Sequence, residues 1–269
     1  MSARRGTWLK PYAVATLMFL YAPVFLLPVF AFNDGAIIGF PLKGFSTANF
    51  EQLYETSALH TAVFNSLMVG LTASVLATLL GICAARAATR YDFPLKKPVM
   101  GFIMLPLVLP EIIVAVSLLV VLIQLGLDLS LWTVILGHVL ICTPFAIAIL
   151  SSAFQSLDQS LEEASYDLGE TRFGTFRRVT FPLVLPGVIS SLLISFTISL
   201  DEFIIAFFLT GTEPTLPVYI WSQLRFTAKL PSVMALGFLM LIVSLALLIA
   251  AEYFRRRAQS RRGGEGGYL

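Results

Sequence analysis

Six long runs of apolar residues, separated by polar segments, make up most of the chain. A membrane-spanning helix needs about 20 consecutive, mostly apolar residues, and every run reaches that length. The runs cover residues 12–32, 61–88, 98–125, 131–153, 183–210 and 232–253. The pattern therefore predicts an all-α integral membrane bundle of six helices, forming a single domain over residues 1–269.

The first run has a second interpretation, because Arg4, Arg5 and Lys10 precede it as basic residues precede the core of a signal peptide. Such a core has roughly 7–15 apolar residues. The run 12–32 is longer, and no clear small-residue cleavage site follows it. We therefore expect it to remain in the protein as the first helix.

The composition fits a lipid environment. Hydrophobic residues make up 57% of the 269 positions and charged residues 13%, against roughly 25% charged in a soluble domain. Cys83 and Cys142 each lie inside an apolar run, which favours two free thiols. No Cys/His cluster or Ser/His/Asp set suggests a metal centre or an active site. His138, inside the fourth run, is expected to be a hydrogen-bonded structural residue.

Lysine and arginine are distributed unevenly between the two sides of the predicted bundle. Fifteen of the 18 fall on the side that holds both termini, and the other three are Lys43, Arg225 and Lys229. Basic residues are enriched in cytoplasmic segments of membrane proteins. Both termini are therefore expected in the cytoplasm.

Small residues and prolines recur within the runs. The second run carries four small residues at near-helical spacing: Gly70, Ala73, Ala77 and Gly81. Such residues let helix backbones approach closely in a membrane. In the third run, Pro106 and Pro110 would kink or break the helix, which is tolerated at membrane depth only where protein or a wet cavity covers the freed backbone groups. We favour a helix that lines a pathway, because Glu111 follows directly.

The segment 154–182, between the fourth and fifth runs, carries an apolar stripe at the spacing of one helix face. Its members are Leu157, Leu161, Ala164 and Leu168. Asp158, or else Ser160 with Glu163, would cap the start of this helix. Gly169 would end it, and a second short helix is expected over 171–178. The stripe has two equally favoured interpretations. The helix could lie on lipid headgroups or on its own bundle, or it could dock in a groove of a soluble partner.

The same segment resembles the EAA loop of ABC importer permeases, whose pattern is E-A-A, three residues, glycine, nine residues and I-x-L-P. Here Glu163, Ala164 and Ser165 open the motif, with serine in place of the third residue. Gly169 follows after three residues, and V-T-F-P, which ends at Pro182, after nine more. The resemblance extends over nearly the whole chain, as a five-helix permease core at about 61–253 with one extra helix before it.

This resemblance implies a type I ABC importer permease fold in a bacterial inner membrane. It makes 154–182 the coupling loop, whose motif residues contact an ATPase. The implied partners are an ABC ATPase dimer, a second homologous permease, a periplasmic solute-binding protein and the lipid bilayer, with no nucleic acid. The chain has no G-x-x-x-x-G-K-[ST] motif, which would cradle the phosphates of ATP. ATP and Mg²⁺ are therefore expected on the partner, and no cofactor on this chain.

Three acidic residues, Glu111, Asp201 and Glu202, lie inside predicted spans. A carboxylate at the bilayer centre costs at least about 2.5–3.5 kcal/mol, so such residues usually face the bundle interior. A cationic solute would be a fitting counter-charge. Hydrogen bonds within the bundle, or exposure of Asp201 and Glu202 at the outer mouth, are the alternatives. At about 1.5 Å per residue, Asp201 lies about 27 Å from the cytoplasmic start of its helix and Glu111 about 20 Å along its own.

Three aromatic residues near these acids are candidate cation–π partners of such a solute, with packing or interface anchoring as the simpler explanation. They are Phe203, Phe207 and Trp221.

Two segments resemble the spermidine/putrescine permeases. Residues 195–211 follow the pattern S-F-T-x-S-x-D-[DE], with the phenylalanine and glycine that close it, and residues 109–119 resemble S-P-D-I-V-x-A-x-S-L-L with Glu111 replacing an aspartate. The resemblance implies the second permease subunit of a polyamine importer, which passes a small cationic solute from periplasm to cytoplasm by alternating access. Amino-acid-like, quaternary ammonium, opine or ferric solutes are alternatives within the same class.

Two other function classes compete with an importer subunit. A secondary transporter or channel would work without an ATPase, and the EAA-like loop argues against it. A membrane-embedded enzyme would need catalytic residues at a membrane interface, and the sequence contains no such set.

Overall fold

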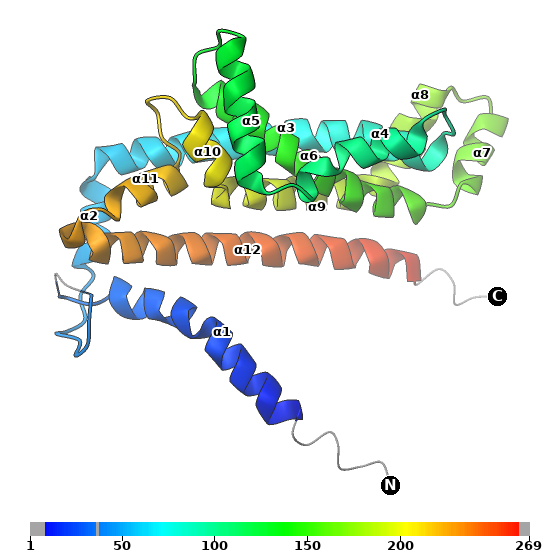
Figure 1. The fold of residues 1–269 in the computed structure, drawn as a ribbon. Coiled ribbons are helices and arrows are strands. Elements are labelled where there is room, and N and C mark those ends of the chain that lie inside the picture. Colours follow the sequence, from blue (N-terminus) through cyan, green and yellow to red (C-terminus); the bar gives the residue numbers. More distant parts are fainter. Residues whose placement is uncertain (1–8, 36–37, 264–269) are drawn as a thin grey trace. The chain divides into compact units, whose positions relative to one another are not determined.

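The computed structural model describes residues 9–35 and 38–263, so Arg4 and Arg5 lie outside the described residues. Among the described residues, regular secondary structure is helical apart from one isolated bridge between Asn33 and Phe45 (Figure 1). Five described helices are long and apolar enough to cross a membrane: Leu9–Ala31, Ser57–Arg90, Leu131–Gln155, Arg172–Asp201 and Thr227–Tyr253. The shorter apolar helix Glu111–Gln124 joins them. The all-α membrane architecture predicted from the apolar runs is confirmed.

The described elements are long and short α-helices, with short 3₁₀ or π-helical turns between some of them. In chain order they are α1 (Leu9–Ala31), α2 (Ala48–Glu55), α3 (Ser57–Arg90), α4 (Lys96–Ile103), η1 (Leu105–Leu107), α5 (Glu111–Gln124), α6 (Leu131–Gln155), α7 (Ser160–Asp167), α8 (Arg172–Thr175), η2 (Phe176–Thr180), α9 (Phe181–Asp201), α10 (Ile204–Leu209), α11 (Leu216–Gln223), η3 (Thr227–Lys229) and α12 (Leu230–Gly263). They fall into two compact units, one of Met1–His60 with Ile220–Val243 and one of Thr61–Tyr219 with Ser244–Leu269.

The third predicted span, 98–125, is not one continuous helix. It is divided into α4, the single 3₁₀ turn η1 and α5. Pro106 lies within η1, and Pro110 is extended at the N-cap of α5. Proline has no N–H to donate and its ring clashes with the preceding turn, so these two residues interrupt the helical hydrogen bonds. The run 98–125 therefore holds two helices, and the interruption lies at the two prolines where the sequence predicts a kink or break.

The fifth predicted span, 183–210, is also divided. Helix α9 ends at Asp201, Glu202 is extended, and α10 begins at Ile204. The break coincides with a charged residue that caps the following helix, so the chain restarts its hydrogen bonding there. At the other end, the predicted short helix over 171–178 is α8 followed by the π-helical turn η2, which runs directly into α9.

The core of the second unit lies where α3, α5, α6 and α10 meet. Its buried apolar residues include Val69, Val114, Val134 and Ile205. A second cluster, with Leu150, Phe154, Leu157 and Val184, lies where α3, α6 and α9 meet near α7. Figure 1 shows α7 and α8 together at one end of this unit.

The small residues of α3 permit the close packing that their spacing predicts. A Cβ added at Gly70 would lie 3.0 Å from the Phe196 ring of α9, and one at Gly81 would lie 2.8 Å from the Cβ of Ala146 in α6. Ala73 and Ala77 are completely buried. These small residues therefore mark where α3 approaches α6 and α9.

The first unit is held together by a few side-chain contacts around its extramembrane segment. The Asn49 amide of α2 donates hydrogen bonds to the carbonyls of Ala31 and Asn33, at 3.0 and 3.1 Å. Ser232 donates one to Gln52 at 2.6 Å. The most apolar stretch of α1 is only 6% buried, as expected of a helix that faces lipid.

Candidate functional site

Helix α7 begins with a side-chain cap. The Asp158 carboxylate accepts a hydrogen bond from the backbone N–H of Ser160 at 3.0 Å. This bond lowers the pKa of Asp158, because it favours the charged form of the carboxyl group. Of the two caps that the sequence allows, the structure uses Asp158.

Helix α7 ends at Gly169, as predicted. Gly169 has a φ of +84°, a left-handed conformation that glycine adopts without the steric cost of a Cβ. Its N–H donates to the carbonyl of Tyr166 at 2.9 Å, and the N–H of Glu170 donates to the carbonyl of Ser165 at 3.1 Å. These two bonds form a Schellman motif, which satisfies the last carbonyls of the helix.

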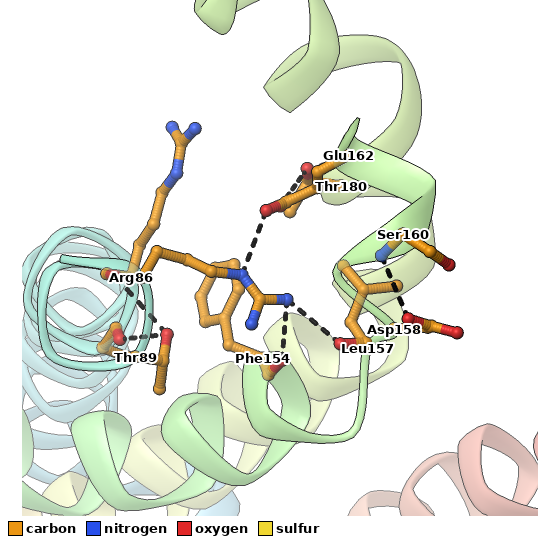
Figure 2. A network of polar contacts seen from close by, with 10 residues as sticks. Arg86, Thr89, Phe154, Leu157, Asp158, Ser160, Glu162 and Thr180 are labelled. Atoms are coloured by element: carbon orange, nitrogen blue, oxygen red, sulfur yellow. Dashed lines mark hydrogen bonds and ion pairs between the residues drawn. The ribbon is translucent and has the colours of Figure 1, made fainter. Parts of the chain in front are cut away.

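A buried ion pair joins the last turn of α3 to the first turn of α7 (Figure 2). Nε of Arg90 lies 3.0 Å from Oε2 of Glu162, and the two side chains are only 9% and 10% exposed. The other carboxylate oxygen of Glu162 accepts a hydrogen bond from Thr180 at 2.7 Å. Arg90 also donates to the carbonyls of Phe154 and Leu157, both at 3.1 Å. The ends of α3 and α6, the start of α7 and the turn η2 are thus tied together.

The apolar stripe of α7 lies largely on its outer surface. Leu157 is buried in the cluster beneath the helix, at 6% exposure, whereas Leu161 is 45% and Leu168 88% exposed, and Ala164 is exposed as well. Leu157 therefore packs on the bundle, as one of the two interpretations expects. The other three residues of the stripe, Leu161, Ala164 and Leu168, remain exposed among the described residues.

The motif residues differ in their surroundings. Four of the five are exposed: Glu163, Ala164, Gly169 and Pro182. Ser165 is partly buried, and its hydroxyl lies 3.0 Å from that of Thr175, a contact between α7 and α8. The exposed glutamate and alanine thus lie beside the exposed part of the stripe.

Two of the three predicted pathway acids lie at the starts of two helices that pack together in the second unit. Glu202 is buried, and its carboxylate accepts a hydrogen bond from the N–H of Ile205 at 2.8 Å, which caps α10. Helix α10 packs on α5, and Glu111 is exposed in the first turn of α5. Neither forms an ion pair within the described residues.

Asp201, the third acid, lies on a different face from Glu202. It is exposed at the end of α9, and Ser244 of α12 donates to its carboxylate, with distances of 3.1 and 3.2 Å to the two oxygens. A single hydroxyl leaves most of the acceptor capacity of a carboxylate unused. Asp201 can therefore accept further donors.

Comparison with known proteins places these features in a family. A sequence profile described as "Binding-protein-dependent transport system inner membrane component" matches residues 77–260. The chain belongs to this family. The spermidine/putrescine transport system permease protein PotC of Haemophilus influenzae is 35% identical over 240 residues, or 89% of this chain and 93% of PotC. The putrescine transport system permease protein PotI of Escherichia coli strain K12 is 33% identical over 266 residues, or 96% of this chain and 94% of PotI.

Solved structures share the fold of this inner membrane component. A chain of a bacterial ABC transporter that imports the acidic polysaccharide alginate superposes with a TM-score of 0.71 at 22% identity, over 93% of this chain and 94% of that one. A chain of the inward-facing MetNI methionine ABC transporter gives 0.63 at 17% identity, over 74% and 95%. The predicted ABC importer permease fold is confirmed.

The aromatic candidates of the inner membrane component lie in two places. The rings of Phe203 and Phe207 are 5.4 Å apart beside the Glu202 cap, and Phe207 is 43% exposed. Trp221 belongs to the first unit and is 48% exposed. His138, as predicted, is buried and hydrogen-bonded: its Nδ1 lies 2.6 Å from the hydroxyl of Ser199.

Three residues of this site in the inner membrane component were not predicted from the sequence: Arg90, Glu162 and Thr180. Glu162 directly precedes the motif residue Glu163, and one step along a helix turns the side chain by about 100°. Glu162 therefore faces the bundle, and Glu163 faces outward. In the sequence, Arg90 is one of many basic residues at helix ends, and nothing in its spacing marks its partner.

Proposed function

We propose that this inner membrane component is one of two permease subunits of an ABC importer that carries polyamines such as spermidine and putrescine into the cytoplasm. The observation that carries the proposal is α7, an outward-facing helix with the Glu163-Ala164-Ser165 motif, fixed to the ends of α3 and α6 by Arg90 and Glu162. The relatives PotC and PotI, named for spermidine and putrescine, support the choice of solute.

Helix α7 would dock in a groove of the partner ATPase. The exposed Leu161, Ala164 and Leu168 offer an apolar face, which is how an amphipathic helix enters a groove. The exposed Glu163 beside this face can pair with a basic residue of the partner. Gly169, with no Cβ at the turn, leaves room for close approach.

Movement of α7 would reach the membrane helices through the contacts around Arg90. The ion pair and its hydrogen bonds link α7 to α3, α6 and η2, and η2 continues into α9. A rigid link transmits displacement, whereas a flexible loop would absorb it. ATP binding by the partner can drive alternating access only if the ATP-bound partner binds one permease conformation more tightly than the other.

ATP and Mg²⁺ would bind to the ATPase subunits, and this chain would hold no cofactor. In this proposal the chain supplies the pathway and the coupling loop, and the hydrolysis of ATP is the work of the partner.

The three acids would lie along the solute pathway. Helix α9 runs from Phe181 to Asp201, about 30 Å at 1.5 Å per residue, so that Asp201 lies far from the coupling loop and near the outer side. Glu202 caps α10 and Glu111 begins α5, on which α10 packs, and several acids along one pathway suit a cation with more than one positive charge. The faces of Phe203 and Phe207 would contribute cation–π contacts, and Trp221 of the first unit is a separate candidate for such a contact.

The proposed topology places α7 and both termini in the cytoplasm. A periplasmic solute-binding protein would deliver the solute at the opposite side, and a second, homologous permease subunit would complete the pathway. This arrangement accounts for the exposed apolar surfaces of the described helices, which lipid and the second subunit would cover.

The test is uptake of radiolabelled putrescine and spermidine by source cells with and without this gene, with an ATP-depleted control. ATP-dependent uptake lost on deletion and restored by the wild-type gene supports the proposal. Unchanged uptake in cells without a redundant polyamine system would discard polyamines, and the wider solute panel would follow. Copurification in mild detergent tests the class separately, since an importer subunit brings an ATPase with it and a secondary transporter does not.

A further inference from the structure

Two cavities adjoin at the end of α3. The first, of about 510 Å³, is mainly apolar and lies between α3 and the segment α8–η2–α9. Its apolar lining includes Leu79, Ile82, Ala87, Phe173, Phe176 and Phe181. The second, of about 220 Å³, is polar and lies between α3 and α7. Arg86 and Tyr91 line both, so the two cavities adjoin at these residues.

The positive charge shared by the two cavities is that of Arg86. Its guanidinium carbon lies 4.4 Å from the centre of the Phe176 ring, and its Nε is buried without a hydrogen-bond partner. In Figure 2 no dashed line joins this guanidinium to the ion-pair network of Glu162. Since a buried donor of a charged group gains most from an anionic acceptor, Arg86 is suited to bind an anion.

The remaining charges of the polar cavity favour a negative ligand. Arg90 and Glu162 neutralise each other in their ion pair. Arg172 and Arg86 then outnumber Glu163, the other acidic residue that lines this cavity. Tyr91 adds a hydroxyl that can donate a hydrogen bond.

The cavities lie at the end of α3, where its apolar stretch gives way to basic and aromatic residues. The apolar stretch of α3 ends here, and Arg86, Arg90 and Tyr91 follow it. Arginine and tyrosine are typical of the boundary between membrane and water. An anionic phospholipid has its phosphate at that boundary and its acyl chains on the apolar side of it. The polar and apolar cavities follow one another along α3 in the same order.

We propose that this pair of cavities binds a phospholipid with an anionic headgroup. The phosphate lies against Arg86, Arg172 and Tyr91, and one acyl chain lies in the cavity formed by Phe173, Phe176 and Phe181. Basic pockets between membrane helices on the cytoplasmic side are suited to such headgroups. The assignment to the inner leaflet rests on the topology of the proposed function. Because the walls belong to α7, α8 and η2, the bound lipid holds the coupling loop against α3.

Native mass spectrometry of the permease purified with its partners tests the site. Phosphatidylglycerol, phosphatidylcholine with the same acyl chains, and glycerol 3-phosphate are titrated against delipidated protein. Arg86→Gln removes the charge and Cys83→Phe fills the apolar cavity, which Cys83 lines as an exposed residue. Arg177→Gln is the matched control, because Arg177 is an exposed arginine of the same segment that lines neither cavity.

We expect wild type and Arg177→Gln to retain phosphatidylglycerol in preference to phosphatidylcholine. Arg86→Gln should weaken phosphatidylglycerol about fivefold, the effect of one basic residue at a membrane surface, and Cys83→Phe should weaken both lipids. Equal retention of phosphatidylglycerol by Arg86→Gln and the control would overturn the proposal. The proposal would also be overturned if glycerol 3-phosphate displaced phosphatidylglycerol and Cys83→Phe did not change lipid retention. That result would indicate a site for small anions.

The same preparation separates this proposal from the function proposed above. Lipid retention is measured without ATP or solute, while ATPase copurification and polyamine uptake report on the importer. Loss of lipid selectivity with intact uptake would remove only the lipid site. Absence of an ATPase and of uptake with lipid selectivity retained would remove only the importer assignment.

Discussion

Nε of Arg90 lies 3.0 Å from a carboxylate oxygen of Glu162, and both side chains are almost fully buried. Through this contact the end of one membrane-spanning helix holds the start of the exposed helix α7. The contact explains why two adjacent glutamates have different surroundings. Glu162 is buried against Arg90, and Glu163 is exposed on the surface of α7.

Glu162→Gln should lower the stability of the purified chain, whereas Glu163→Gln should not. Removing one partner of a buried ion pair typically costs about 3–5 kcal/mol, although glutamine can keep the bond to Thr180. An exposed substitution usually changes stability by less than about 0.5 kcal/mol. Thermal unfolding in detergent measures the difference. Equal unfolding temperatures for the two variants would mean that the ion pair does not anchor the loop.

Gly169→Ala should weaken the end of α7 by about 1 kcal/mol, because a Cβ disfavours the left-handed conformation. Gly169→Pro should cost more, since it also removes the N–H that bonds to Tyr166. We expect lower ATP-dependent uptake with normal membrane insertion for both, in the order Pro below Ala. Gly169→Asn, which tolerates this conformation better, is the control and should retain most uptake. Wild-type uptake in the proline variant would contradict the role of this turn in coupling.

Asp201→Asn should reduce uptake of cationic solutes. The substitution keeps the shape of the side chain and removes its charge, so a charge-assisted hydrogen bond of about 1.5–3 kcal/mol is weakened and apparent affinity falls about ten- to hundredfold. Ser244→Ala removes the neighbouring hydroxyl and leaves the charge, so it should have a much smaller effect. Concentration-dependent uptake of labelled polyamine distinguishes the two. The same affinity and rate in Asp201→Asn and wild type would remove Asp201 from the pathway.

Gly81→Ala and Gly101→Ala should change stability in opposite directions. A Cβ at Gly81 would lie 2.8 Å from that of Ala146 and 3.0 Å from Leu150, whereas one at Gly101 meets no atom within 4 Å. Overpacking costs about 1–3 kcal/mol, while alanine in an open helical position gains up to about 1 kcal/mol over glycine. Unfolding temperatures of the two variants provide the measurement. A stabilised Gly81→Ala variant would show that α3 and α6 are less closely packed than described.

The local features of this protein follow from the sequence alone. Apolar runs predict helices because the bilayer satisfies no backbone hydrogen bonds. Helices α1, α3 and α6 lie close to the predicted ranges 12–32, 61–88 and 131–153, while α12 contains the predicted range 232–253 and continues to Gly263. The helix break at Pro106 and Pro110 and the stop at Gly169 follow from the chemistry of single residues. The spacing of the EAA-like motif is likewise a property of consecutive residues.

The tertiary structure alone decided which polar groups are partners. Arg90 and Glu162 are far apart in the chain, and each stands near residues of the same charge that face elsewhere. Only the placement of the end of α3 beside the end of α6 and the start of α7 makes these two residues partners. The placement of Glu202, which caps α10, depends in the same way on α10 packing against α5, the helix that begins at Glu111. Periodicity determines which face of a helix is apolar, but the partner of a charge is determined by which other helix reaches it.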